Sequence, residues 1–435
     1  MVTLTGEDVA GAALRPERSE VLGQPSPDAR APGTDRPGRR SAGVEALGVL
    51  ARTLRDRDGG RVDRPLAGGG SFPLSWVRSG PADDVPVLFV PGGPGMATVL
   101  PYERLRATAA AHGVGSVMVE HRGTGLSRED SRGRDLSLGD VTVEAAADDL
   151  AAVLDHLRVE RAVVHGSSYG TYLAQVFGVR HPGRVAAMVL DSPLLSVAGD
   201  LADVRAHRRR LLWDADTDLA AAVRSAPAPA DEVAAVVPTV YEFAGPDALL
   251  RLLAARREGR LGTVWRQLAH LVDGEFEGRG VRHVTEPDLV AGIAFGQLGF
   301  GLPPDGGPLD PQVAFARVAA DRPPYRGEPY DLPSLLPGFP WPTVVVSGER
   351  DLTTPRSTAE RVAGLLPAGV LLDLPGLGHS AMDTHQRAAV LVAAAVRAGN
   401  ARRLPALAER IAALPRRGAS RWLGTAVRAA VRLGG

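Results

Sequence analysis

Residues 163–173 read Val-Val-His-Gly-Ser-Ser-Tyr-Gly-Thr-Tyr-Leu, and this stretch is the most informative in the sequence. Within it, residues 166–170 fit the pattern Gly-x-Ser-x-Gly, in which a serine occupies a sharp turn between a strand and a helix. The apolar run 162–164 predicts the strand, and residues 172–177 predict the helix. A chain with 51 glycines contains such a pattern often by chance, so the flanking elements carry the argument. Together they predict that Ser168 is a nucleophile.

Two segments near the C-terminus supply the acid and the base that such a serine needs. The β-branched run 343–348 predicts a buried parallel strand, and the polar loop after it contains Asp351. The run 369–374 predicts the last strand, and the glycine-rich loop after it contains His379. Serine, acid and histidine follow one another in this order in the α/β-hydrolase fold. We therefore expect His379 to accept the proton of Ser168 and Asp351 to orient the imidazole.

Other residues of the same types compete for these roles. The chain has ten histidines, and His379 is distinguished by its glycine-rich loop after a strand. His165 ends the strand before the serine and is expected to be structural, while His385 is a weaker alternative base. Glu349 is the alternative acid, and Asp351 is preferred for its place in the loop.

A glycine-rich loop early in the chain predicts an oxyanion hole. The apolar strand 86–90 runs into Pro-Gly-Gly-Pro-Gly at 91–95. A backbone N–H of this loop can donate to the reacting oxygen together with the N–H of Tyr169, the residue after the nucleophile. A phosphate-binding loop is the alternative, but no Gly-Lys-Ser/Thr follows and the chain contains no lysine. After the next strand, Glu120 and Arg122 are expected to brace the loops around the site.

These segments together resemble the peptidase family of α/β-hydrolases that includes proline iminopeptidases and tripeptidyl aminopeptidases. The matching motifs, in chain order, are Gly92-Gly93-Pro94-Gly95, Glu120–Ser127, Gly166–Gly170, Gly348–Asp351 and Gly378-His379. The resemblance covers roughly residues 70–195 and 338–395. It implies a triad of Ser168, Asp351 and His379, and it implies Gly93 and Tyr169 as the oxyanion-hole donors.

The resemblance also bears on substrate binding. Members of this family hold a substrate α-ammonium with carboxylates, some of which come from a lid over the site. The position that resembles the acidic lid residue is Gln297, and a neutral amide cannot form the charge-assisted bond of a carboxylate. Glu242, Glu275 and Glu277 are the candidate replacements. Gln297 and Glu242 are therefore our predicted substrate-binding residues.

Composition sets broad limits on the protein. Its 435 residues, 44% of them hydrophobic, suffice for a large core, and a formal net charge of zero favours no nucleic-acid partner. The absence of cysteine excludes disulfides, thiolate metal ligands and a thiol nucleophile. No apolar run approaches the ~20 residues that cross a bilayer. We expect a soluble cytoplasmic protein with no metal and no cofactor.

The pattern of segments predicts a mostly parallel central sheet flanked by helices, with a helical cap inserted into it. Residues 61–194 and 338–400 form the two parts of the core, and 195–337 form the cap, or lid. Residues 1–60 are predicted to be disordered or loosely packed, apart from a short amphipathic stretch that can pack on the core. Residues 401–435 are predicted to form basic amphipathic helices.

The basic tail has two interpretations. Its apolar residues Trp422, Val427 and Val431 fall on one helical face and Arg421 and Arg428 on another. Such a helix can lie on a membrane surface, or it can pack on the core or on a protein partner. Packing is the preferred interpretation because basic amphipathic stretches are common. The sequence does not predict the oligomeric state.

We predict a serine hydrolase that cleaves an amide or ester bond through an acyl-enzyme. A peptidase or aminopeptidase-like enzyme acting on short peptides is preferred. The alternative is a carboxylesterase or another acyl hydrolase of small lipophilic esters. A catalytically silent binding protein on the same fold is a third hypothesis, and the complete set of Ser168, Asp351 and His379 argues against it.

Overall fold

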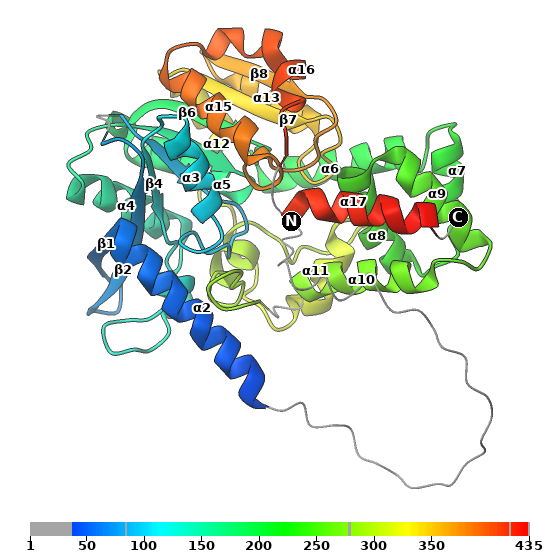
Figure 1. Ribbon diagram of the computed structural model, residues 1–435, viewed down its shortest axis with the longest axis horizontal. Coiled ribbons are helices and arrows are strands. Elements are labelled where there is room, and N and C mark those ends of the chain that lie inside the picture. Colours follow the sequence, from blue (N-terminus) through cyan, green and yellow to red (C-terminus); the bar gives the residue numbers. More distant parts are fainter. Residues whose placement is uncertain (1–36, 83–84, 277–279, 417–418, 434–435) are drawn as a thin grey trace, which may run out of the picture.

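The strands of the described residues form one eight-stranded sheet, in the order β1-β2-β4-β3-β5-β6-β7-β8 (Figure 1). The structure, a computed structural model, describes residues 37–82, 85–276, 280–416 and 419–433. The strands are β1 (Gly59–Pro65), β2 (Ser71–Ser79), β3 (Val87–Val90), β4 (Ser116–Val119), β5 (Ala162–Ser167), β6 (Val185–Asp191), β7 (Thr343–Gly348) and β8 (Gly369–Leu374). Neighbouring strands from β4 to β8 are parallel, and β1 and β2 add an antiparallel edge. The predicted mostly parallel sheet is confirmed.

Each face of the sheet packs against its own layer of helices. Successive side chains of a strand point to opposite faces, so Leu88 and Val90 join one hydrophobic core while Val87 and Phe89 join the other. The first core contains residues of α4 (Val143–His156), α5 (Tyr169–Arg180) and α13 (Arg356–Leu365). The second contains residues of α2 (Pro37–Asp58), α3 (Glu103–Ala111), α15 (Gln386–Arg397) and α16 (Ala408–Ala412). Because both faces are covered, β3, β4, β5 and β7 are buried along their whole length.

A long helical segment lies between β6 and β7. It contains α6 (Val197–Leu212), α7 (Asp218–Arg224), α8 (Ala230–Ala244), α9 (Pro246–Arg257), α10 (Gly262–Phe276), a π-helical segment (Gly292–Gln297), α11 (Gln312–Ala319) and α12 (Leu332–Leu335). We call α6–α11 the inserted helices. Helices α7–α10 gather to one side of the sheet (Figure 1) around a core of their own, in which Leu249, Leu252 and Trp265 are buried.

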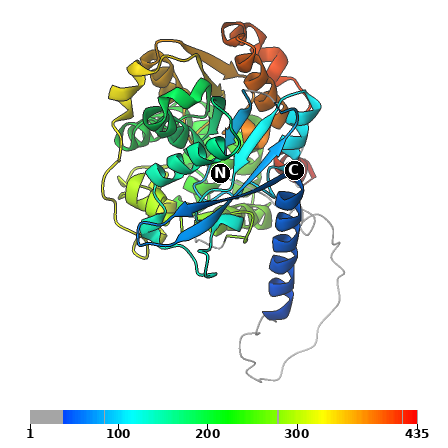
Figure 2. The ribbon, with the colours of Figure 1, turned by 90° about the vertical axis from the view of Figure 1, so that its left-hand side faces the viewer.

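The N-terminal part of the described chain contains the short amphipathic stretch that was expected to pack on the core. Residues 1–36 lie outside the described part, but α2 and the start of β1 fall within the segment predicted to be disordered or loose. The last turns of α2 are ordered because Ala51 and Leu54 are buried against the core, whereas Val49 and Leu50 stay exposed. Figures 1 and 2 show the first turns of α2 projecting away from the body.

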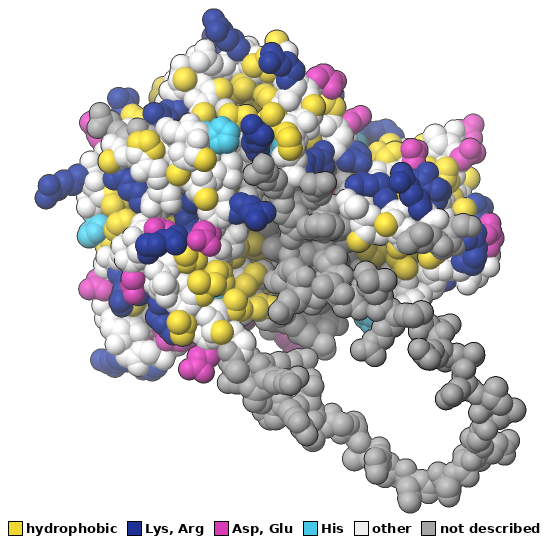
Figure 3. Space-filling view, viewed as in Figure 1, with side chains coloured by type: hydrophobic (Ala, Val, Ile, Leu, Met, Phe, Trp, Pro, Cys, Tyr) yellow, Lys and Arg dark blue, Asp and Glu magenta, His cyan; other side chains and the backbone are white. Residues whose placement is uncertain are grey.

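The C-terminal helix α17 (Ala419–Leu433) packs on the same chain, across α8 and α9 (Figure 1). Val427 is buried in the core of the inserted helices, and a Cβ on Gly424 would lie 2.2 Å from the carbonyl oxygen of Phe243. No helix in the described ranges combines the length and the apolarity that crossing a bilayer requires. On the face shown in Figure 3, basic and acidic side chains are interspersed.

Candidate active site

Ser168 occupies the turn between β5 and α5 in a strained backbone conformation. Its φ is 52° and its ψ is −123°, a region that few residues other than glycine adopt. Two features stabilise this conformation. The N–H of Ser168 donates to the carbonyl of Asp191 (2.9 Å), and the flanking glycines allow neighbouring backbone segments to approach closely. A Cβ on Gly166 would lie 2.2 Å from the carbonyl oxygen of Gly170, so only glycine fits there.

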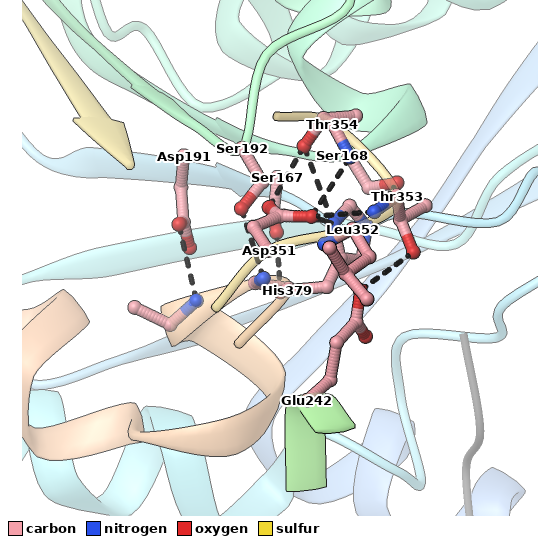
Figure 4. A network of polar contacts seen from close by, with 12 residues as sticks. Ser167, Ser168, Asp191, Ser192, Glu242, Asp351, Leu352, Thr353, Thr354 and His379 are labelled. Carbon is pink, nitrogen blue, oxygen red and sulfur yellow. Dashed lines mark hydrogen bonds and ion pairs between the residues drawn. The ribbon is translucent and has the colours of Figure 1, made fainter. Parts of the chain in front are cut away.

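The three residues predicted as a triad meet at the carboxyl ends of β5, β7 and β8 (Figure 4). The Oγ–H of Ser168 donates to Nε2 of His379 (2.8 Å). Nδ1–H of His379 donates to both carboxylate oxygens of Asp351 (3.1 and 3.0 Å). All three side chains are buried. A parallel sheet collects the loops after its strands at one edge, which explains how residues so distant in sequence come together.

The alternative acid and bases lie elsewhere. The carboxylate of Glu349 accepts the N–H of Gly376 (2.6 Å) at the surface. His165 is buried against Phe89, and burial lowers its pKa to about 3. His385 is buried at the start of α15, where burial also lowers its pKa. None of these residues is placed to accept the proton of Ser168.

The charges of Asp351 and His379 stabilise one another. Burial alone would lower the pKa of His379, but the charge of Asp351 and its hydrogen bond outweigh this and raise that pKa above its usual value. Burial likewise opposes ionisation of Asp351, yet His379 and the N–H of Thr354 together lower the pKa of that carboxyl. The acid therefore stays ionised beside the imidazole at neutral pH.

Donors in the loop after β7 fix the orientation of the acid. Oδ1 of Asp351 accepts the N–H groups of Thr353 (2.9 Å) and Thr354 (2.8 Å), and Oδ2 accepts the hydroxyl of Thr354 (2.9 Å). Our sequence reasoning missed the two threonines. The signal was present, because Asp followed by hydroxyl residues and proline is typical of a turn in which the Asp side chain bonds its own backbone.

Of the two predicted oxyanion-hole residues, Gly93 borders the same space and Tyr169 directly follows the nucleophile. Gly93 lines the cavity that contains Ser168 and His379, and its φ of +118° is strained for any residue with a side chain. Tyr169 is the first residue of α5, where the backbone N–H groups have no partner within the helix. The phenol of Tyr169 and Nε2 of His121 share a hydrogen bond (2.9 Å), which holds this end of α5.

Glu120 and Arg122 brace the surrounding loops, as predicted. The buried carboxylate of Glu120 accepts the N–H groups of Thr98 (2.5 Å), Val99 (2.9 Å) and Leu126 (3.1 Å). Arg122 donates two hydrogen bonds of 2.7 Å to Asp149 on α4. These hydrogen bonds satisfy both buried side chains and hold the loop after β4.

Asp191 performs a similar role for the loop that carries His379. Its carboxylate accepts the N–H groups of Ala381 (3.0 Å) and Met382 (2.7 Å), just after the histidine. Burial raises the pKa of Asp191 to about 7. The hydroxyls of Ser167 and Ser380 share a further hydrogen bond (2.5 Å), so the serine turn and the histidine loop are tied directly.

A cavity of about 690 Å³ opens in front of Ser168 and His379. The core contributes Gly93 and Met96, and the inserted helices contribute much of the rest. Phe295, Phe300 and Phe315 line one region of it and contact one another, with ring centroids 5.0 to 6.5 Å apart. This size and this apolar wall suit a small organic substrate or a short peptide.

Gln297, a predicted substrate-binding residue, does not line the cavity. Its Oε1 accepts the N–H of Val143 (3.0 Å), and its Nε2 donates to Glu144 (2.9 Å). The first N–H groups of α4 lack partners within the helix, and this amide satisfies one of them instead of facing the cavity. Glu277 and the side chain of Glu275 lie outside the described residues.

Glu242 lines the cavity, as predicted, but it also contacts the loop after β7. Its Oε1 accepts the N–H of Leu352 (2.6 Å) and the hydroxyl of Thr353 (3.2 Å) (Figure 4). Two polar groups that our sequence reasoning missed also line the cavity. Within the described part of the chain, Oε1 of Glu328 and Oε1 of Gln312 are buried without a hydrogen-bond partner. No local motif marks either residue.

The described residues contain no group of three or more His, Asp or Glu side chains that could hold a metal ion. The chemistry that the site can perform with its own groups is proton transfer and nucleophilic attack. A hydroxyl, an imidazole and a carboxylate in series are the arrangement that activates a serine.

Comparison with known proteins agrees with the fold. A family model described as the alpha/beta hydrolase fold matches residues 85–239. The chain is 24% identical over 321 residues to a probable proline iminopeptidase of Leptolyngbya boryana, a match that covers 71% of this chain and 86% of the relative. It is 31% identical over 117 residues to a proline iminopeptidase of Arabidopsis thaliana, covering 27% of this chain and 29% of the relative.

Among solved structures, the proline iminopeptidase of Mycobacterium smegmatis superimposes with a TM-score of 0.44 and 19% identity, covering 78% of this chain and 98% of that one. The resemblance that the sequence motifs indicate is therefore confirmed by curated relatives.

Proposed function

We propose that this protein, an enzyme of the α/β-hydrolase family, is a serine hydrolase that cleaves an amide or ester bond through an acyl-enzyme. One observation carries the proposal. The hydroxyl of Ser168, the imidazole of His379 and the carboxylate of Asp351 form a continuous chain of hydrogen bonds beside a cavity. A protein that only bound a ligand would have no physical need for all three groups in this order.

In the proposed reaction, Nε2 of His379 takes the proton of Ser168 as Oγ attacks the substrate carbonyl. The oxygen of the tetrahedral intermediate becomes negative and accepts hydrogen bonds from the N–H groups of Gly93 and Tyr169. One such donor is typically worth about 3 kcal/mol in the transition state. His379 then gives its proton to the leaving amine or alcohol, and the same steps with water release the acid.

For the substrate we favour a short peptide or an aminoacyl compound, which the likeness to proline iminopeptidases supports. A free α-ammonium needs a carboxylate in the cavity, and Gln297 is directed away from it. Glu328 can supply this carboxylate in place of Gln297. Its Oε2 accepts the N–H of Val197 (3.1 Å), and its Oε1 has no partner among the described residues. A lipophilic ester is the second candidate, and the cluster of Phe295, Phe300 and Phe315 favours it.

The test offers purified protein a series of aminoacyl anilides and a series of nitrophenyl esters, beside Ser168→Ala as the inactive control. We expect turnover by the native chain, none by the variant, and labelling of Ser168 by a fluorophosphonate. Turnover of esters alone would select the esterase. If neither series turns over and no label is incorporated, the serine-hydrolase proposal is wrong.

A further inference from the structure

The backbone of Leu352, next to the predicted catalytic acid Asp351, is held at both its N–H and its carbonyl group by the inserted helices. Its N–H donates to Oε1 of Glu242 on α8 (2.6 Å). Its carbonyl accepts a hydrogen bond from Nε of Arg208 on α6 (2.9 Å). Both side chains are buried, so the two bonds are shielded from competing water.

The side chain of Leu352 strengthens this attachment. It is completely buried, and it belongs to the hydrophobic core of the inserted helices together with Val240 and Leu249. A residue of the loop after β7 is therefore embedded in the packing of α8 and α9. Because a large buried side chain contributes strongly to the stability of a core, this attachment is a strong one.

The same end of α8 also touches the loop of His379. A Cβ placed on Gly378 would lie 3.0 Å from Cβ and 3.1 Å from the carbonyl oxygen of Glu242, so that the glycine packs directly on this residue. In Figure 4, Glu242 reaches from the end of its helix toward Leu352 and Thr353, beside His379. One residue of the inserted helices thus contacts both the acid loop and the base loop.

We propose that Glu242 and Arg208 are positioning residues, which hold the Leu352 peptide from both sides and so couple the inserted helices to the Asp351–His379 pair. Their role is to keep the carboxylate aimed at Nδ1 of His379 while the cavity admits substrate. The inference rests on the proposed function, because it assigns these residues to the orientation of a general base. A shift of about 1 Å in such a group can cost about 10²-fold in rate.

The charges around Glu242 make a neutral replacement informative. Charged groups that act on it include Asp351, His379, Arg208 and Arg350. Burial, followed by the charge of Asp351, raises the pKa of Glu242. Glutamine keeps the shape and an oxygen that can accept the N–H of Leu352. Alanine removes both. Glu242→Gln therefore tests the charge alone, and Glu242→Ala tests the hydrogen bond together with the rest of the side chain.

The experiment compares Glu242→Ala, Glu242→Gln and Arg208→Met with a matched control, Glu232→Ala. Glu232 lies on the same helix, and it accepts a hydrogen bond from Trp265 (2.7 Å) rather than from the loop. We expect Glu242→Ala and Arg208→Met to lower kcat and the rate of fluorophosphonate labelling about 10²-fold with little change in KM. Glu242→Gln recovers most of this loss, and Glu232→Ala lowers Tm without lowering kcat.

A second readout needs no substrate. The proton between Nδ1 of His379 and Asp351 is expected to give a downfield NMR signal in the native chain and in Glu242→Gln. In Glu242→Ala this signal is expected to be absent. Unchanged kcat and an unchanged signal in Glu242→Ala would overturn the inference. So would a rise in KM alone, which assigns Glu242 to substrate binding. Absence of turnover and labelling in the native chain would refute the proposed function instead, and the NMR signal would still decide the positioning role.

Discussion

Ser168 and its neighbours illustrate what single residues contribute to the site. The strained φ of 52° is tolerated because Gly166 and Gly170 let two backbones approach and because the N–H of Ser168 is bonded to Asp191. The strain turns Oγ toward Nε2 of His379 rather than into the helix. The turn requires glycine or serine at each of these nearby positions, so the pattern can be recognised in the sequence.

The pH dependence of activity should report the environment of His379. The base must be neutral to accept a proton, and Asp351 raises its pKa above 6.5, so kcat/KM should fall as pH drops through a midpoint above that value. Asp351→Asn removes the main opposition to burial, although the charge of Glu242 still raises the pKa of His379. The midpoint should therefore move to lower pH, and kcat should fall about 10⁴-fold. Measured pH profiles of the two proteins check this. An unshifted midpoint in Asp351→Asn would show that another residue titrates.

Glu328 should matter for substrates that carry an amine. If its unpartnered oxygen binds an α-ammonium, Glu328→Gln should raise KM for aminoacyl anilides about 10-fold or more, since bonds to charged groups are worth about 1.5–3 kcal/mol. Nitrophenyl esters that lack an amine are the internal control and should keep their KM. An equal change for both series would mean that the substitution disturbs the cavity and not a charge-specific contact.

At the scale of the elements, α8 joins the site to the C-terminal helix. Its C-terminal end carries Glu242, which contacts the loops of Asp351 and His379, and Phe243, which contacts α17. The last helix of the chain therefore supports the element that holds the acid loop. The segment is a helix, as its hydrophobic pattern predicts, and Val427 is buried in the core that it shares with α8 and α9.

The contact between α17 and α8 can be tested by adding a side chain at Gly424, where the helices are too close to accommodate one. Gly424→Val places a side chain within reach of the carbonyl oxygen of Phe243, 2.2 Å from the first added carbon, and should destabilise the fold by about 1–3 kcal/mol. Ala426→Val is the matched control, because residue 426 is exposed on the same helix. Thermal unfolding of both variants measures the difference. Equal Tm values would mean that α17 does not rest on α8.

At the scale of the whole molecule, the parallel sheet is what assembles the site. Ser168, Asp351 and His379 follow β5, β7 and β8, and these strands end at one edge of the sheet. The helices on both faces bury the strands, and the inserted helices enclose about 690 Å³ in front of the nucleophile. Most of the sheet was predictable because buried parallel strands are continuous apolar runs bounded by glycines.

β1 was not predictable in this way. Its sequence Gly-Gly-Arg-Val-Asp-Arg-Pro has one apolar side chain, and it forms a strand because β2 offers it an edge. Here tertiary contact overrides weak local preference. The last turns of α2 differ, because an amphipathic stretch is visible there in the sequence and its Ala51 and Leu54 are buried.

The amino-acid sequence alone was enough to identify the strand–serine–helix turn, the acid and histidine loops, and the order in which they occur, because each depends on residues within a few positions of one another. It could not show that Gln297 bonds the start of α4, that Glu242 holds Leu352, or that Glu328 faces the cavity. These depend on where helices come to rest against loops some 100 or more residues away in the chain. Such placement follows from side-chain packing over the whole core, which no short motif encodes.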